Sequence, residues 1–357
     1  MVKIIAEAGV NHNGSADLAF KLVDAAYTAG ADIVKFQTFK AEKLATRAAR
    51  QAEYQARNTE VSESQFAMLS RLELDYGTYK ALAAYCNKLG IEFLSTAFDS
   101  ESLEFLVNDL GLTTLKIASG ELTSAPFVLE HARTGCDLIV STGMATLAEV
   151  ESALGVIAFG FTCGAEAVPS EMAFYEAYAS KAGREALQRK VTLLHCTTEY
   201  PAPMEEINLR AMQTMATSFG LIPGYSDHSA GITIPVAAAA LGAQVIEKHF
   251  TLDNTMDGPD HKASLEPDEL AAMVRAIRGV ELALGNGVKG PQPSELKNKA
   301  VARKSLIAAS PIRVGELFTK ANLTVKRPGD GLSPYRYWAL LGCVAGRDYE
   351  EGEFIRG

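Results

Sequence analysis

Short apolar runs alternate with amphipathic segments along the first 285 residues or so. The segments between the runs have helical periodicity, and three of them end at Gly30, Gly90 and Gly111. Thr146 opens another with a capping box, and Pro267 suits a first helical turn. The apolar runs have the length of strands and lie at residues 4–6, 33–34, 91–94, 115–118, 138–140, 191–194, 221–225 and 245–246. Eight strand-then-helix units of this length predict a (β/α)8 TIM barrel.

The alternative architecture is an open doubly wound sheet. A nucleotide-binding sheet of this kind typically has a glycine-rich G-x-G-x-x-G turn after its first strand. Here residues 11–14 are Asn-His-Asn-Gly, with a single glycine. Polar residues follow all eight runs, whereas an open sheet collects its ligands at one switch point. The closed barrel is therefore favoured, and its reacting groups are expected at the C-terminal ends of the strands.

Two stretches interrupt the alternation, and a tail follows it. Residues 40–75 are charged and weakly periodic, which predicts a long βα loop able to cover a pocket. Residues 160–189 predict a short surface helix, and Gly290-Pro291-Gln292-Pro293 reads as a linker. We therefore predict a catalytic barrel over residues 1–287, then a linker and a small, mostly irregular β-type domain over 288–357. The core of that domain is marginal alone, so we expect it to dock on a barrel.

Composition and charge narrow the classes of function. The chain has 357 residues, of which 48% are hydrophobic and 22% charged, as in ordinary soluble globular proteins. A net charge of -9 argues against nucleic acid or an anionic membrane surface as the main partner, although a small anionic substrate stays compatible. Five scattered cysteines without a C-x-x-C pair support neither a disulfide framework nor a zinc ribbon. With no signal-peptide pattern at the start and no long apolar run, we expect a cytoplasmic protein.

Two of the predicted strands end in a carboxylate and a histidine, at Asp227-His228 and at Glu247-Lys248-His249. If these strands are parallel neighbours, both imidazoles lie at the same sheet edge. With Asp260 also near, the group could hold a divalent cation and orient its waters. Oxygen and imidazole ligands favour Mn²⁺ or Mg²⁺ over thiolate-bound zinc, with Zn²⁺ and Co²⁺ still open. The alternative is that each histidine only satisfies a buried strand end.

Lys35 and Lys116 interrupt apolar strands, where a charge is expected only if it faces the barrel mouth. An ion pair of Lys35 with Glu7 inside the core is the alternative. The lysines and nearby hydroxyls would suit a phosphate or carboxylate. The hydroxyls are those of Thr96, Ser119, Ser141 and Ser226.

Carboxylates at the strand ends are candidates for acid-base chemistry. They are Glu7, Glu121, Glu247 and Asp260. We favour Glu121 as a base or water-orienting group, and an ordinary helix cap is the alternative. His131 falls within a predicted helix, where a solvated face is expected.

Ten motifs in order give nearly the whole chain a resemblance to the sialic acid synthases, the family of N-acetylneuraminate and legionaminate synthases. The motifs are AEAGVNHNG (6–14), VKFQTFKAEKL (34–44), FLSTAFD (93–99), LKIASGEL (115–122), VSTGMAT (140–146), LLHCTTEYPAP (193–203), GYSDHS (224–229), IEKHFTLD (246–253), GPDHKASLEPDEL (258–270) and KRPGDGLSP (326–334). Only the 160–189 stretch looks unlike relatives.

The resemblance implies a barrel followed by an antifreeze-like SAF domain of the β-clip type, joined in a domain-swapped homodimer. It implies condensation of phosphoenolpyruvate with an open-chain 2-acetamido hexose and release of phosphate. By motif, His228 and His249 would bind the metal, Mn²⁺ or else Mg²⁺ or Co²⁺, and Glu121 would orient the attacking water. Arg327 would reach into the partner's active site. Phosphoenolpyruvate would contact Lys35, Thr96, Lys116, Ser119, Ser141 and Ser226, and the sugar would contact Gln37, Thr198, Tyr200 and Asp260.

The acceptor sugar is suggested by Thr197-Thr198, a pair similar to that of the legionaminate branch. The expected acceptor is then 2,4-diacetamido-2,4,6-trideoxymannose, ahead of N-acetylmannosamine. The pseudaminate branch fits less well because the Gly258-Pro259-Asp260-His261 motif is present. Two other functions are weighed: a metal-dependent sugar aldolase, and a carbohydrate- or ice-binding protein acting through the C-terminal domain.

Overall fold

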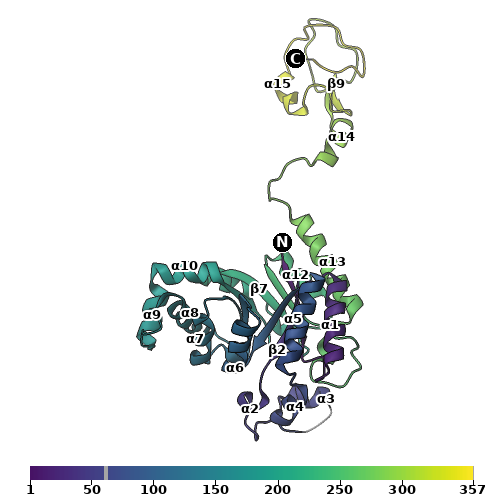
Figure 1. Cartoon of the computed structure of the whole chain (residues 1–357). Coiled ribbons are helices and arrows are strands. Elements are labelled where there is room, and N and C mark those ends of the chain that lie inside the picture. Colours follow the sequence, from purple (N-terminus) through teal and green to yellow (C-terminus); the bar gives the residue numbers. More distant parts are fainter. Residues whose placement is uncertain (60–62, 357) are drawn as a thin grey trace. The chain divides into compact units, whose positions relative to one another are not determined.

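The computed structural model describes residues 1–59 and 63–356. Internal contacts divide the chain into two compact units, Met1–Gly285 and Asn286–Gly357. Figure 1 shows the chain coloured by sequence, with its elements labelled.

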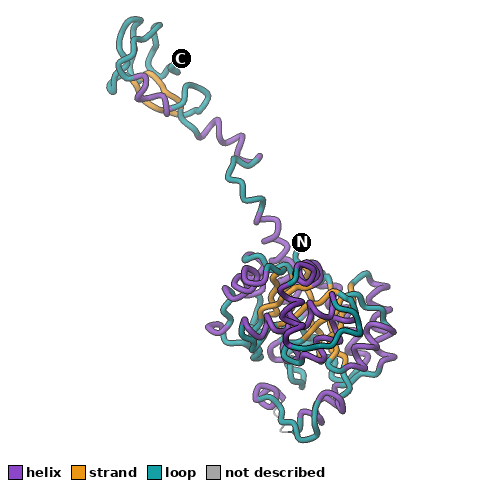
Figure 2. The backbone as a smooth tube through the Cα atoms, turned by 90° about the vertical axis from the view of Figure 1, so that its left-hand side faces the viewer, coloured by secondary structure: helices purple, strands orange, loops and turns teal. Residues whose placement is uncertain are grey.

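The first unit is a closed barrel of eight parallel strands in sequence order, which confirms the predicted (β/α)8 fold. The barrel closes where β1 pairs with β8, with Lys3 opposite Val245 and Glu7 opposite His249. Helices surround the strands in both views (Figures 1 and 2). The strands are β1 Lys3–Gly9, β2 Ile33–Thr38, β3 Glu92–Ala97, β4 Thr114–Ile117, β5 Asp137–Ser141, β6 Val191–His195, β7 Ile222–Asp227 and β8 Val245–His249.

Helices begin or end as predicted at Gly30, Gly90, Thr146 and Pro267, whereas before Gly111 the helix α6 continues as a π-helical turn, Phe105–Asp109. Gly30 and Gly90 cap their helices in the left-handed conformation, where glycine has no Cβ to clash. Thr146 forms its capping box with Glu149, and Pro267 is the first residue of α13. The helices are α1 Ala16–Ala29, α2 Ala41–Leu44, α3 Glu53–Thr59, α4 Gln65–Leu72, α5 Tyr76–Leu89, α6 Ser100–Glu104, α7 Ala125–Arg133, α8 Leu147–Thr162, α9 Glu171–Ala179, α10 Lys181–Lys190, α11 Arg210–Phe219, α12 Thr233–Ala240 and α13 Pro267–Leu284.

The long connection between β2 and α5, expected as a loop, carries the helices α2, α3 and α4. Ser64 caps α4 by accepting a hydrogen bond from the Ala67 amide. Apolar side chains of α4 then pack into a small core of their own beside the barrel. Its fully buried members are Val10, Phe39, Ala41, Met68, Leu69 and Leu72. Part of the expected loop, residues 60–62, lies outside the described residues.

The stretch 160–189, expected to hold one short helix, contains the end of α8 and two further helices, α9 and α10. The two are separated at Ser180, whose backbone is extended and whose hydroxyl accepts a hydrogen bond from the Gly183 amide. A serine in this conformation ends one helix and caps the next.

The expectation of a solvated His131 is wrong, because its side chain is buried within α7. His131 lies one turn after Phe127, and its Nδ1 hydrogen-bonds the Phe127 carbonyl at 2.9 Å. It therefore shares the buried face of α7 with Phe127, Val128 and Ala132. Burial lowers the pKa of His131 to about 4.

The second unit holds a short antiparallel pair of strands, β9 Ser305–Ala308 and β10 Leu323–Lys326, with Leu323 opposite Ala308. Two helices also belong to it, α14 Pro293–Ala302 and α15 Tyr337–Leu340. Isolated bridges and turns make up much of the rest, as expected for an irregular β-type module. Its own core consists of Leu306, Ala308, Ile312, Phe318, Leu323, Ala345, Tyr349 and Ile355. Within the described part of the chain, no helix has the length and apolarity needed to cross a lipid bilayer.

Candidate active site

Two layers of inward-facing side chains lie one above the other inside the barrel. Because side chains alternate along a strand, a residue two positions further on points into the same interior. The lower layer is aliphatic: Ile5, Ile33, Leu94, Ile139, Leu194 and Val245. Two residues further along the same strands stand Glu7, Lys35, Thr96, Ser141, Cys196 and Glu247. Alternation thus places polar groups directly above an apolar floor, at the C-terminal end of the barrel.

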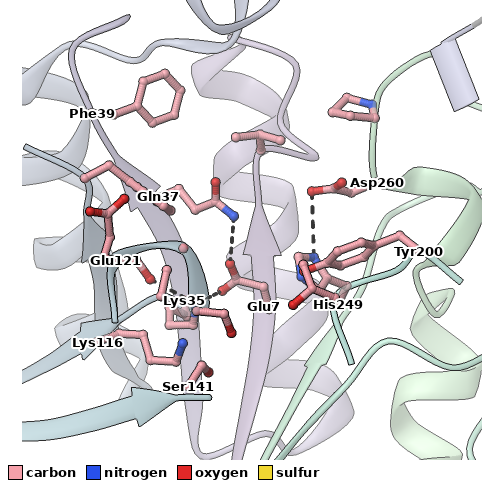
Figure 3. A pocket seen from close by; sticks show the side chains of 18 of the residues that line it. Glu7, Lys35, Gln37, Phe39, Lys116, Glu121, Ser141, Tyr200, His249 and Asp260 are labelled. Carbon is pink, nitrogen blue, oxygen red and sulfur yellow. Dashed lines mark hydrogen bonds and ion pairs between the residues drawn. The ribbon is translucent and has the colours of Figure 1, made fainter. Parts of the chain in front are cut away.

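A cavity of about 300 Å³ opens above that floor. Except for Asp227, every barrel residue that the sequence singled out for catalysis, substrate or metal lines it. They are Glu7, Lys35, Gln37, Thr96, Lys116, Ser119, Glu121, Ser141, Thr198, Tyr200, Ser226, His228, Glu247, His249 and Asp260. In Figure 3 Lys116 and Ser141 lie at one end of this cavity, whereas His249, Tyr200 and Asp260 lie across from them.

Two lysines and two glutamates form a buried charge network in the cavity. The Lys35 ammonium lies 2.7 Å from Glu7 Oε2 and 3.5 Å from Glu247 Oε2, and it donates to Thr96 Oγ1 at 3.1 Å. The Lys116 ammonium lies 3.7 Å from Glu247 Oε1. The two alternatives expected for Lys35 both hold: it forms an ion pair with Glu7, and it also faces the cavity.

The surroundings shift the pKa values of Glu7 and Glu247 in opposite directions. Burial raises the pKa of Glu7, with Lys35 opposing and Glu247 adding to the rise. Burial also acts on Glu247, but the attraction of Lys116 and Lys35 outweighs it and leaves the pKa of Glu247 lowered. Burial likewise lowers the pKa of Lys116. An anionic ligand bound beside these lysines would favour the charged form of Lys116, so this end of the cavity suits an anion.

His228 and His249 lie side by side with ring centroids 5.6 Å apart. Burial lowers the pKa of His228 to about 4 and that of His249 well below its usual value, so both rings are neutral near pH 7. His228 Nδ1 lies 2.6 Å from the Thr197 carbonyl, which can only accept, so Nδ1 carries the proton and Nε2 keeps its lone pair. His249 Nδ1 is buried without a hydrogen-bond partner. The Ser226 hydroxyl lies at a long 3.4 Å from His228 Nε2. Two neutral imidazoles so arranged suit a divalent cation.

The carboxylates expected around this pair are arranged differently. Asp227 faces away from the cavity, because it alternates with Ser226 and His228 along β7, so its expected place beside the cation is wrong. Glu247 is engaged by the lysines. Asp260 Oδ2 lies 4.0 Å from His249 Nδ1, and burial raises the pKa of Asp260 to about 6. Among the described residues, no three His, Cys, Asp or Glu side chains are gathered as a ready-made metal site.

Several polar groups in the cavity are left without protein partners. The hydroxyls of Ser141 and Thr198 are buried and unpaired. Gln37 donates to Glu7 Oε1 at 3.3 Å, and the ring of Tyr200 lies against that of His228, with centroids 4.1 Å apart. Glu121 stands in a 3₁₀ turn at Ser119–Glu121, and burial raises its pKa. Unpaired buried hydroxyls are costly alone, which fits groups kept for a ligand.

Sequence reasoning missed an apolar wall of the cavity. The β2–α5 connection contributes Leu44, Met68, Leu69 and Leu72, together with the amides of Gln55 and Gln65. Val10, Phe39, Phe98 and Pro259 complete this side, and Figure 3 places Phe39 at the far side of the cavity from Lys116 and Ser141. Met68, Leu69 and Leu72 share one helical face, a periodicity that could have revealed the wall.

Arg327 lies outside the barrel unit. It follows β10 in the second unit, and its side chain is exposed.

Family models and known proteins match this chain over most of its length. Residues 22–289 match the NeuB family and residues 303–357 match a SAF domain, which confirms the expected SAF domain. An N,N'-diacetyllegionaminic acid synthase of Campylobacter jejuni is 49% identical over 99% of this chain and 98% of its own. A protein of the same name from Legionella pneumophila is 43% identical, over 95% and 89% of the two chains. The structure also resembles an N-acetylneuraminic acid synthetase of Leptospira borgpetersenii, solved with citrate, with a TM-score of 0.66 and 33% identity over 83% of this chain and 90% of that one. The chain therefore belongs to the NeuB family.

Proposed function

We propose that the protein is a nonulosonic acid synthase, which joins phosphoenolpyruvate to an open-chain 2-acetamido mannose-type sugar and releases phosphate. The single observation that carries the proposal is the cavity itself. One end offers two lysines and the unpaired Ser141 hydroxyl for an anion, and the other offers two neutral histidines for a cation. Family membership and 49% identity to a legionaminic acid synthase support it.

Phosphoenolpyruvate is assigned to the lysine end. Lys35 and Lys116 supply charge for its phosphate and carboxylate, and Ser141 supplies a buried hydroxyl that has no protein partner. The remaining hydroxyls of this end belong to Thr96, Ser119 and Ser226. Charge-assisted hydrogen bonds of this kind are the strong ones in a dry site. A bound anion would also offset, through charge attraction, the desolvation that lowers the pKa of Lys116.

The histidine end is assigned to the sugar aldehyde. His228 and His249 would hold a divalent cation, Mn²⁺ in first place and Mg²⁺ or Co²⁺ as alternatives, which when bound supplies Lewis-acid polarisation of a carbonyl. Asp260, Tyr200, Gln37 and Thr198 then position the sugar. Burial raises the pKa of Asp260 to about 6, closer to neutral pH than that of an ordinary aspartate, which suits it to exchange a proton with groups at this end.

The reaction balances with the residues of this cavity. C3 of phosphoenolpyruvate forms a bond to the aldehyde carbon, and the aldehyde oxygen gains a proton. Water adds at C2, and the C2–O bond breaks as phosphate leaves. Glu121, with a pKa raised by burial, is suited to orient that water and take its proton. Glu7 and Glu247 hold the lysines in place.

For the acceptor, the apolar wall favours a sugar with a methyl group at its far end over one with a hydroxyl. This supports 2,4-diacetamido-2,4,6-trideoxymannose ahead of N-acetylmannosamine, with the amides of Gln55 and Gln65 available to an acetamido group. An apolar pocket rejects an added hydroxyl by roughly 100-fold at most, so the preference would be real but not absolute.

The domain-swapped homodimer, with Arg327 completing the partner's site, is part of the proposal. The sharpest test co-expresses an Arg327→Ala chain with a His228→Ala chain. In a swapped dimer, mixed pairs contain one intact site, so activity returns well above that of either variant alone. Lys326→Ala, an exposed neighbouring cation, is the matched control and should be active by itself. Mixtures no better than the separate variants would contradict the swap.

The activity test supplies phosphoenolpyruvate, Mn²⁺ and each of the two sugars, and measures released phosphate and product mass. We expect phosphate release with a nine-carbon or longer acid as product, faster with the diacetamido sugar. Sugar cleavage without phosphate release would identify an aldolase instead. Thermal hysteresis without turnover would favour the ice-binding alternative.

A further inference from the structure

A fully buried ion pair lies directly behind the two histidines of the cavity. Asp227 and Lys248 are both 0% exposed, and the Lys248 ammonium lies 2.5 Å from Asp227 Oδ2. Neither residue lines the cavity. Their strand neighbours do: Ser226 and His228 flank Asp227, and Glu247 and His249 flank Lys248. The pair therefore lies on the other face of the same two strand ends.

Further hydrogen bonds fix this pair to the backbone after β7. Asp227 Oδ1 accepts from the Ser229 hydroxyl at 2.8 Å and from the Ser229 amide at 3.2 Å. The Lys248 ammonium also donates to the Ser229 carbonyl. Asp227 and Lys248 are opposite each other in the β7–β8 register. The network thus joins the residues adjoining His228 to the residue before His249.

Stability does not explain such a pair well. Removing two charges from water costs several kcal/mol per ion, and replacing a buried pair with apolar side chains is often neutral or stabilising. What the pair does provide is one fixed separation of two strand ends, because an ion pair with three further hydrogen bonds tolerates little displacement. A large cluster of buried apolar side chains lies around the strands elsewhere.

We propose that Asp227 and Lys248 are positioning residues that set the spacing and orientation of His228 and His249 for a divalent cation. The inference rests on the proposed role of the two histidines. Groups behind metal ligands typically change metal affinity by 10- to 100-fold when they are altered.

The test compares Mn²⁺ affinity and stability in the full-length chain. In the double variant Asp227→Asn, Lys248→Met, which removes both charges and keeps similar volumes, we expect the dissociation constant for Mn²⁺ to rise by about 10- to 100-fold in calorimetric titration. The melting temperature of the metal-free chain should stay unchanged or rise. Lys248→Arg, which keeps the charge, should recover part of the affinity and serves if the double variant fails to fold.

The matched control is the pair Asp32–Arg278, joined at 2.6 Å between the segment before β2 and α13. Asp32→Asn with Arg278→Met should leave Mn²⁺ affinity unchanged. A loss of less than about threefold in the double variant would overturn the proposal, and a larger loss, absent in the control, supports it. If the double variant does not fold, Lys248→Arg is judged by the same threshold, because its forked head cannot keep the same geometry with Asp227. His228→Ala distinguishes a failure of the proposed metal site from a failure of the positioning role. If that variant keeps full Mn²⁺ affinity, the histidine site itself is wrong. If it loses the metal while the double variant keeps it, only the positioning role fails.

Discussion

The two layers inside the barrel come from the same strands and face the same interior, yet they serve opposite purposes. The lower layer, from Ile5 to Val245, is wholly aliphatic, and the layer two residues above it carries Glu7, Lys35 and Glu247. Burying the lower layer stabilises the barrel, by roughly 1.5–3 kcal/mol per side chain. Burying the upper one costs free energy, which only paired charges limit. The side chains that stabilise the barrel and those proposed to react are therefore only two residues apart along the same strands.

His131 is a buried polar residue that belongs to neither layer. It lies in α7, away from the cavity. Its Nε2 has no hydrogen-bond partner. It therefore carries the cost of a buried polar group without a place in the proposed chemistry.

The largest effect is expected from the histidines above the floor. His228→Ala or His249→Ala should lower turnover by at least about 100-fold and remove bound metal, since even groups behind metal ligands cost 10- to 100-fold. Circular dichroism should show an unchanged fold. A variant with full metal content would contradict the site. His195→Ala, at the end of β6 outside this cavity, is the matched control and should retain metal.

A smaller loss of activity is expected from the cationic part of the upper layer. Lys116→Met should lower turnover by on the order of 100-fold, the effect of removing one preorganised electrostatic partner. The free energy of unfolding should stay within about 1 kcal/mol or increase, because Glu247 keeps Lys35 and Ser226 as partners. Lys80→Met, on the exposed surface, is the control for loss of a charge. Strong destabilisation with normal turnover would show that Lys116 stabilises the barrel and takes no part in the reaction.

The lower layer should respond in the opposite way. Leu194→Ala should lower the free energy of unfolding by about 2–5 kcal/mol through lost burial and a cavity. KM for phosphoenolpyruvate should change little at temperatures where the chain stays folded. Denaturant unfolding and steady-state kinetics measure the two quantities. An activity loss with unchanged stability would mean that the floor also shapes the substrate site.

The effect of His131 titration is absent at neutral pH, because the stability difference develops only as the pH falls. Its pKa is about 4 in the folded chain and about 6.5 when unfolded, so the unfolded state binds the proton first. Stability from this group is full above pH 6.5 and is lost as pH falls toward 4, by up to about 3 kcal/mol. His131→Phe should flatten that part of the stability curve by this amount, measured by urea unfolding at pH 7 and pH 4.5. An unchanged slope would show that His131 does not titrate on unfolding.

The sequence predicted those features that depend on neighbouring residues only, such as strand periodicity and helix caps. Eight apolar runs, glycine caps at Gly30 and Gly90 and the capping box at Thr146 predicted the barrel elements correctly. Because parallel strands in a closed barrel end on the same side, polar residues from all eight strand ends reached one cavity, although Asp227, Lys248 and His195 did not. The errors came from which face a side chain takes: Asp227 was expected beside the histidines and lies behind them, and His131 was expected in water and is buried.

The sequence by itself therefore determined the period of strand and helix, the closure of the barrel, and which residues stand at its rim, since these follow from spacing along the chain. Only the tertiary structure decided how those residues share their charges. Burial raises the pKa of Glu7 despite the nearby Lys35, whereas at Glu247 the attraction of two ammonium groups, Lys116 and Lys35, outweighs burial and lowers the pKa. The apolar wall of α4 and the buried pair Asp227–Lys248 likewise arise from packing between segments far apart in sequence, because burial and Coulomb interaction depend on distance in space.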